Sequence, residues 1–104
     1  MGLIPLYDDN MRMIGNVEFV DNLTLSHVPD YVNMNGLMGL KRLDQSYGNL
    51  SGHIVLMLYD KHNPKSSYAE IISEREAYRY CLNRGKLELA SELDLKFVEE
   101  VEVV

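Results

Sequence analysis

The chain has 104 residues, the size of one domain and too short for two independent hydrophobic cores. Ten Lys and Arg residues against 16 Asp and Glu residues give a net charge of −6. This charge argues against a surface that collects nucleic acid or anionic lipid. We therefore expect a single globular domain over residues 1–104, with no direct nucleic-acid partner and no membrane.

Cysteine usage and hydropathy favour a cytoplasmic protein. The single cysteine, Cys81, cannot form an internal disulfide. The first residues lack the basic start and the long apolar stretch of a signal peptide. The longest apolar run, residues 54–59, is far shorter than the roughly 20 residues needed to span a bilayer.

The first 25 residues predict short strands separated by turns. Asp, Asn and Gly residues stand between apolar-rich runs at residues 3–7, 11–14, 17–20 and 23–25. The simplest interpretation is a small meander. Alternatively, residues 11–20 form one strand that is bent at Gly15, where the glycine serves as a β-bulge.

The middle of the chain predicts irregular structure followed by two strands. Residues 26–51 have patchy helical spacing interrupted by Asn and Gly, so we expect short helical turns and loops there. Ile54–Tyr59 is an unbroken apolar run, which predicts a strand covered on both faces and the central strand of a sheet. After a loop over residues 61–67, residues 68–72 predict a strand antiparallel to it.

Two short helices are expected near the C-terminal end. Ser73–Glu76 reads Ser-Glu-Arg-Glu, a capping box that starts a helix, and Gly85 supplies its left-handed stop. Leu87–Leu93 predicts a second helix beside the first. Leu95–Val104 has high β propensity and predicts an edge strand. The fold class is α+β: a small, mainly antiparallel sheet of four to six strands with the two helices packed on one face.

Charge and residue types favour contact with another protein. Residues 69–104 carry five basic and nine acidic groups, which predicts an acidic face formed by the helices and the C-terminal segment. Seven Tyr and six Met, together with edge strands expected at Leu3–Tyr7 and Leu95–Val104, suit a pairing surface. The competing interpretations are a solvated surface and residues that only fill a small core.

The leading hypothesis is a small acidic protein-binding module of the inhibitor, immunity or accessory type. It binds a protein with a basic surface and forms a homodimer. A variant of this hypothesis is mimicry of nucleic acid, in which the partner is a nucleic-acid-binding protein. The predicted partner-binding residues are Tyr80, Glu88, Glu92, Glu99 and Glu100.

The alternative hypothesis is a small-ligand or nucleotide-binding protein. One form of this hypothesis is a minimal hydrolase. Gly36 and Gly39 let a backbone approach a phosphate closely, and Lys41 and Arg42 follow them. The spacing is not that of a P-loop, and Leu and Met stand where a KH-type loop carries polar residues. The candidate ligand-binding residues of this Gly36–Arg42 loop and its surroundings are Gly36, Gly39, Lys41, Arg42, His27 and His53.

The sequence supports no catalytic residue, cofactor or metal, so an enzyme is not the leading expectation. Neither a Gly-x-Ser-x-Gly elbow nor a Ser-x-x-Lys pattern is present. Cys81 falls on the apolar side of its helix, which predicts a core residue and not a nucleophile. His27-x-x-Asp30 and Asp60-x-His62 each offer two ligands, whereas zinc requires at least three from the protein.

Overall fold

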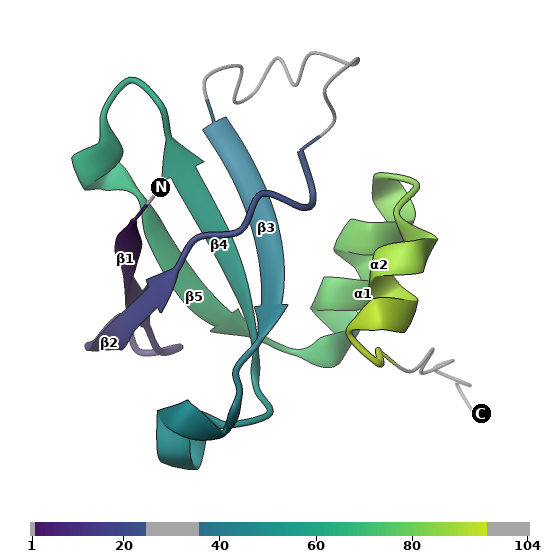
Figure 1. Ribbon diagram of the computed structural model, residues 1–104, viewed down its shortest axis with the longest axis horizontal. Helices are drawn as coiled ribbons and strands as arrows, with labels where there is room; N and C mark the ends of the chain where they lie inside the picture. The colour runs from purple at the N-terminus through teal and green to yellow at the C-terminus, as the bar shows by residue number, and fades with distance from the viewer. Residues whose placement is uncertain (1, 25–35, 96–104) are drawn as a thin grey trace.

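The computed structural model describes residues 2–24 and 36–95, which form an α+β fold (Figure 1). The strands of the described part are β1 (Leu3–Tyr7), β2 (Met13–Glu18), β3 (Gly36–Arg42), β4 (Ile54–Asp60) and β5 (Tyr68–Ile72). Its helices are α1 (Glu74–Asn83) and α2 (Leu87–Glu92), with 3-10 turns η1 (Gln45–Leu50) and η2 (Pro64–Ser66). The sheet order is β2-β1-β5-β4-β3. All neighbouring strands are antiparallel except β1 and β5. The predicted fold class is confirmed.

β4 is buried on both faces, as its unbroken apolar sequence predicts. Alternate side chains of a strand point to opposite faces of the sheet. Ile54 and Leu56 pack in the cluster that includes the helices, whereas Val55 and Met57 pack in the cluster that includes β1 and β2. β4 is antiparallel to β5, as expected. The middle place in the sheet, predicted for β4, belongs to β5, because β1 pairs with the far side of β5.

β1 and β2 form one hairpin with a bulge. The register shifts by one residue between Gly15 and Met13, so Ile14 is the extra residue. The alternative of a single bulged strand is therefore the better prediction, although the strand spans Met13–Glu18 and its extra residue is Ile14, next to Gly15. The prediction of two strands over 11–14 and 17–20 was wrong. The bulge places Met13 on the same face as Tyr7, away from the core.

The two edges of the sheet are β2 and β3. The edge strand predicted at Leu3–Tyr7 was wrong, because β1 pairs with β5 as well as with β2. Of the strand predicted over 23–25, Leu23 and Thr24 are not in a strand, and residue 25 lies outside the described residues. Of the edge strand predicted at Leu95–Val104, Leu95 alone is described, and it is buried.

β3 lies where the sequence predicted a loop. All seven residues of Gly36–Arg42 pair antiparallel with β4. Met38 and Leu40 are buried in the cluster that includes the helices, and this burial outweighs the low strand propensity of the two glycines. The prediction of a loop over Gly36–Arg42 was therefore wrong, whereas η1 is one of the short helical turns expected before residue 51.

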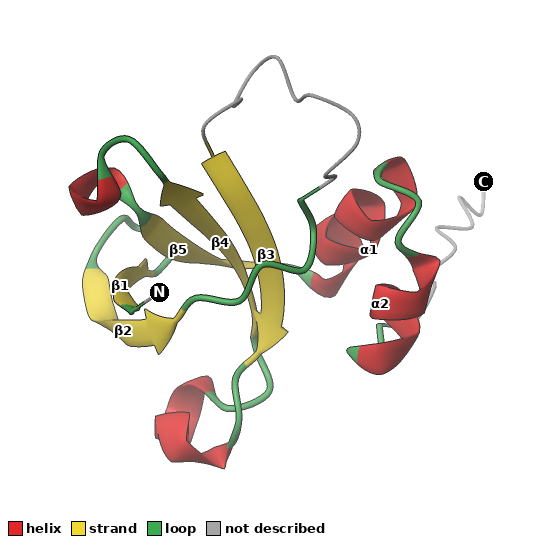
Figure 2. Ribbon diagram, turned by 45° about the horizontal axis from the view of Figure 1, so that its top comes forward, coloured by secondary structure: helices red, strands yellow, loops and turns green. Residues whose placement is uncertain are grey.

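The two helices pack on one face of the sheet, as predicted. They lie beside β3, at the end of the sheet away from β1 and β2 (Figure 2). Ser73 and Glu76 form the capping box: the hydroxyl of Ser73 accepts from the amide of Glu76 at 3.1 Å, and the Glu76 carboxylate accepts from the Ser73 amide at 3.3 Å. Gly85 has a φ of 66° and ends α1. No helix within the described ranges is long and apolar enough to cross a bilayer. The helical residues buried against the sheet are Ala77, Cys81, Leu89 and Ala90.

Candidate interaction surface

Arg42, a candidate ligand-binding residue, is held by the fold. Its Nε and Nη2 atoms donate to the carbonyl oxygen of Leu93 at 3.0 and 2.8 Å, and Nη1 donates to that of Gly52 at 2.6 Å. Nη2 also lies 3.4 Å from a carboxylate oxygen of Glu74. These bonds join the end of β3 to the C-terminal end of α2. The guanidinium is therefore occupied by backbone acceptors.

Gly39 accommodates a crossing of the backbone. A Cβ atom at this position would lie 1.7 Å from the carbonyl oxygen of Val20 and 2.9 Å from its carbonyl carbon. The segment that follows β2 passes over β3 here (Figure 1). The glycine thus faces the protein's own backbone, which leaves no room for a phosphate between them.

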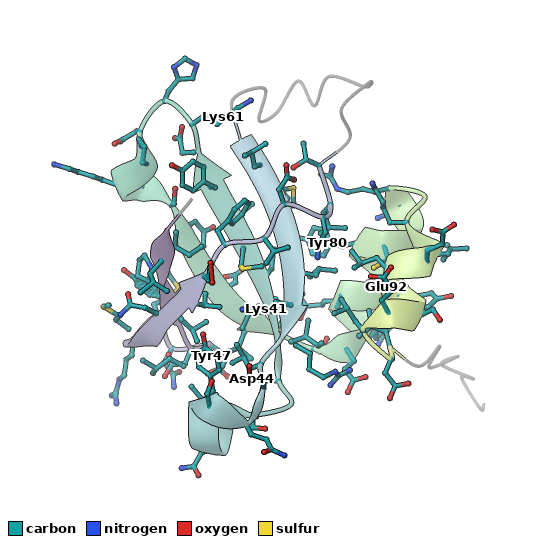
Figure 3. All side chains as sticks on the ribbon, viewed as in Figure 1. Lys41, Asp44, Tyr47, Lys61, Tyr80 and Glu92 are labelled. Atoms are coloured by element: carbon teal, nitrogen blue, oxygen red, sulfur yellow. The ribbon has the colours of Figure 1, made fainter. Side chains whose placement is uncertain are left out.

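The other candidate ligand residues do not converge. Lys41 is half-buried beside a groove of about 350 Å³ (Figure 3). Gly36 is at the opposite end of β3, roughly 20 Å from Arg42 along an extended strand. His53 is exposed, with Nδ1 3.1 Å from the carbonyl oxygen of residue 50, and His27 lies outside the described residues. Within residues 2–24 and 36–95, no three His, Cys, Asp or Glu side chains are grouped to hold a metal ion.

The predicted partner-binding residues occupy different surroundings. Tyr80 is half-buried and packs against the core cluster beneath the helices. Glu88 and Glu92 are exposed on α2, and Figure 3 labels Glu92. Both border a groove of about 690 Å³ beside the turn between the helices. Glu99 and Glu100 lie outside the described residues. A part in partner binding stays a prediction for all five residues.

The single cysteine is a core residue, as the sequence predicts. Cys81 is fully buried in α1, and burial raises the pKa of its thiol. The thiolate is the nucleophilic form, so a raised pKa opposes a nucleophilic role.

The acidic excess of the described residues lies at the N-terminal end. Residues 2–24 carry four carboxylates against the one cation of Arg12, a net charge of −3. Residues 36–95 carry eight acidic and eight basic side chains, so their net charge is zero. The hairpin and the segment after it therefore form the most acidic described part of the molecule. The four carboxylates belong to Asp8, Asp9, Glu18 and Asp21.

The hairpin has an outer face that the helices do not cover, which we call the open flank. Figures 1 and 2 both show α1 and α2 on the far side of β3 from β1 and β2. Two apolar side chains of this face are largely exposed, Leu3 at 69% and Met13 at 58%. The open flank consists of Leu3, Pro5 and Tyr7 from β1 and Met13, Asn16 and Glu18 from β2.

β5 extends the open flank with a second tyrosine and a carboxylate. The ring of Tyr7 lies 6.5 Å from that of Tyr68, and Tyr7 is beside Glu70 in the sheet. Burial, followed by the nearby Glu70 and Tyr80, raises the pKa of Tyr68. Glu70 is half-buried, and no cationic side chain of the described part pairs with it. Two aromatic rings and a carboxylate without a cationic partner among the described residues therefore adjoin the exposed apolar side chains.

The outer edge of β3 is covered by the chain itself. The side-chain amide of Asn22 donates to the carbonyl oxygen of Leu40 and accepts from its N–H, both at 2.8 Å. The Leu23 amide donates to the carbonyl oxygen of Met38 at 3.0 Å, and the Met38 amide donates to the hydroxyl of Thr24 at 2.8 Å. The side chains of Asn22 and Thr24 and the backbone amide of Leu23 thus take the place of a neighbouring strand at Met38 and Leu40.

The outer edge of β2 has no such cover. The amide of Phe19 donates to the carbonyl oxygen of Gly2 at 3.3 Å. Because bonding direction alternates along an antiparallel pair, the groups of Val17 point toward β1 and those of Asn16 and Glu18 point outward. In the part of the chain that the structure describes, nothing bonds to these outward groups.

No known protein family, curated protein or solved structure matches this chain. The surface must therefore be interpreted from its own chemistry. Sequence reasoning missed the open flank because Leu3–Tyr7 is apolar at every position, so the sequence does not distinguish the buried face from the exposed one. The signal present in the sequence was the pair of charged residues, Asp8 and Asp9, directly after an apolar run.

Proposed function

We propose that this protein is a small protein-binding module whose binding surface is the open flank. The observation that supports it most is the exposure of Leu3 and Met13 within the most acidic described part of the molecule. The two side chains lie on one face of the hairpin, about 13 Å apart, because Met13 pairs with Tyr7, four residues from Leu3 along β1. Exposed apolar side chains on one face, rimmed by polar groups, are typical of protein interaction sites. Tyr7 and Tyr68 add a residue type that is enriched at the centres of interfaces.

The partner that fits this surface has an apolar contact surrounded by Lys or Arg side chains. Glu18 and Glu70 lie on the flank, and Asp8 and Asp9 lie in the turn beside it, so a basic partner would be attracted and oriented. An inhibitor, immunity protein or accessory subunit works by this kind of surface contact and needs no catalytic group. We place this function in the cytoplasm, where the single thiol of Cys81 stays reduced.

Paired substitutions on the flank and on the helices test this function. The flank variant carries Leu3→Ser and Met13→Ser, and the control variant carries Leu82→Ser and Leu87→Ser. The two control residues are similarly exposed, at 52% and 51%, but lie on α1 and at the start of α2. Each purified chain is used as bait in a lysate of the cells that naturally produce the protein. The captured proteins are identified and then purified for binding measurements.

The expected result is a partner that binds the wild-type chain and the control variant but binds the flank variant about tenfold or more weakly, a loss of roughly 1.4 kcal/mol. Rising salt should weaken the wild-type complex because charged groups contribute to it. If the flank variant and the wild-type chain bind every partner equally well, the open flank is not the binding surface.

A further inference from the structure

The two edges of the sheet differ in whether another segment of the described chain bonds to them. Residues 22–24 satisfy the outward backbone groups of Met38 and Leu40 in the middle of β3, whereas the outward groups of β2 have no partner among the described residues. Proteins commonly protect sheet edges, because an open edge accepts another strand. We propose that the outer edge of β2 receives an extended segment of the partner as an added strand, an inference that rests on the proposed function.

The outward backbone groups define where this strand would bond. Asn16 and Glu18 each present one N–H and one C=O on the outer edge, two residues apart. An extended segment placed beside them pairs with both residues, and its main-chain hydrogen bonds supply affinity without depending on sequence. Side chains at alternate positions of the segment then supply the specificity.

The side chains beside this edge define the chemistry of the segment. Glu18 and Met13 lie on the same face, opposite Leu3 and Tyr7 of β1, which are four residues apart. A segment that pairs with β2 therefore carries a Lys or Arg next to Glu18 and an apolar residue four positions away, next to Met13. These two side chains lie on the same face of the added strand, over the open flank.

A separate basic partner fits this edge better than a second copy of the chain. Two copies would bring together two parts that each carry a net charge of −3. The bulge at Ile14 also limits the regular part of β2, and symmetric pairing would place one bulge at each end of the joint. Like charge and the short regular stretch both oppose self-pairing, whereas a basic segment meets opposite charge.

Random peptides displayed on phage and selected on the immobilised full-length chain provide the probe. The expected peptides carry a Lys or Arg and an apolar residue four positions apart. Asn16→Pro removes the outward N–H without removing a bond to β1, because proline is tolerated where the N–H faces away from the sheet. Asn16→Thr keeps the N–H and is the matched control.

We expect Asn16→Pro and Glu18→Lys each to weaken binding of the selected peptides about tenfold or more, and Asn16→Thr to leave it within about twofold. Amide exchange of the wild-type chain gives a second measurement that needs no variant. Peptide binding should slow the exchange of the Asn16 and Glu18 amides. Peptides that bind without slowing these amides, or that bind Asn16→Pro as tightly as wild type, would overturn the proposal.

The same variants separate this inference from the proposed function. A natural partner that is lost with the Leu3→Ser, Met13→Ser variant but kept by Asn16→Pro would support the flank and overturn strand addition. A wild-type dimer in sedimentation analysis that dissociates with Asn16→Pro would identify a second copy as the occupant and would overturn the basic partner segment.

Discussion

Gly39 illustrates how one residue's role depends on a neighbour that is distant in sequence. The carbonyl of Val20 crosses directly over it, and any side chain would displace backbone. Gly39→Ala should lower the free energy of unfolding by about 1–3 kcal/mol, the usual cost of overpacking. Urea denaturation measures this loss.

Gly15→Ala is the matched control for that substitution. No atom lies within 4 Å of the Cβ position at Gly15, and its φ is not positive. Its free energy of unfolding should stay within about 1 kcal/mol of the wild type, or rise slightly. Equal losses at the two glycines would contradict the crossing at Gly39.

Arg42 stabilises the junction between β3 and α2. Arg42→Met removes the charged donors to the carbonyl oxygens of Leu93 and Gly52, and should lower the free energy of unfolding by about 2 kcal/mol. Thermal or urea denaturation measures the loss. The adjacent Lys41→Met, which breaks no hydrogen bond of the described part, should change it by about 0.5 kcal/mol or less. A larger loss of stability in Lys41→Met than in Arg42→Met would refute the structural role of Arg42.

The segment at residues 22–24 covers the outer edge of β3, whereas no described segment covers the outer edge of β2. Asn22→Ala removes both hydrogen bonds to Leu40 and should cost about 2 kcal/mol of stability. It also exposes the edge of β3, so the variant should aggregate more readily. Denaturation and light scattering measure the two effects. Asn16→Ala, on the edge that is already open, should change neither, and similar behaviour of both variants would contradict the difference between the edges.

Several elements could be predicted because their signals are local. The capping box at Ser73 and the stop at Gly85 involve residues within one or two helical turns, so both ends of α1 were predicted correctly. The run at Ile54–Tyr59 lacks alternation because two clusters cover it, and that too is visible in the sequence. β3 was missed because its glycines and asparagine neighbours resemble a loop, while its stability comes from pairing with β4.

The whole molecule has two hydrophobic clusters that share the sheet. β4 contributes to both clusters through alternate residues. If β4 leaves the sheet to open one cluster, the other cluster loses its β4 side chains as well. We therefore expect a single cooperative unfolding transition. The labelling of the Cys81 thiol by a thiol reagent and the exchange of the Val17 amide should yield the same free energy of opening. Earlier exchange at Val17 would indicate that the hairpin opens as a separate unit.

Charge at the scale of the molecule could be counted but not located. The sequence gives −6, and a division by position assigned most of it to residues 69–104. In the described structure, the eight cations of residues 36–95 balance their eight carboxylates, and the excess lies on the hairpin and the segment after it. A count along the chain cannot show which charges share a surface.

The sequence by itself determined the fold class, the two helices and the double burial of β4, because capping, periodicity and hydrophobicity are properties of neighbouring residues. Only the tertiary structure decided that Gly36–Arg42 is a strand, that Arg42 binds carbonyl oxygens, and that β2 rather than β1 is an edge. These features depend on contacts between residues far apart in the chain. For the same reason the open flank, which depends on where the helices do not reach, could be found only in three dimensions.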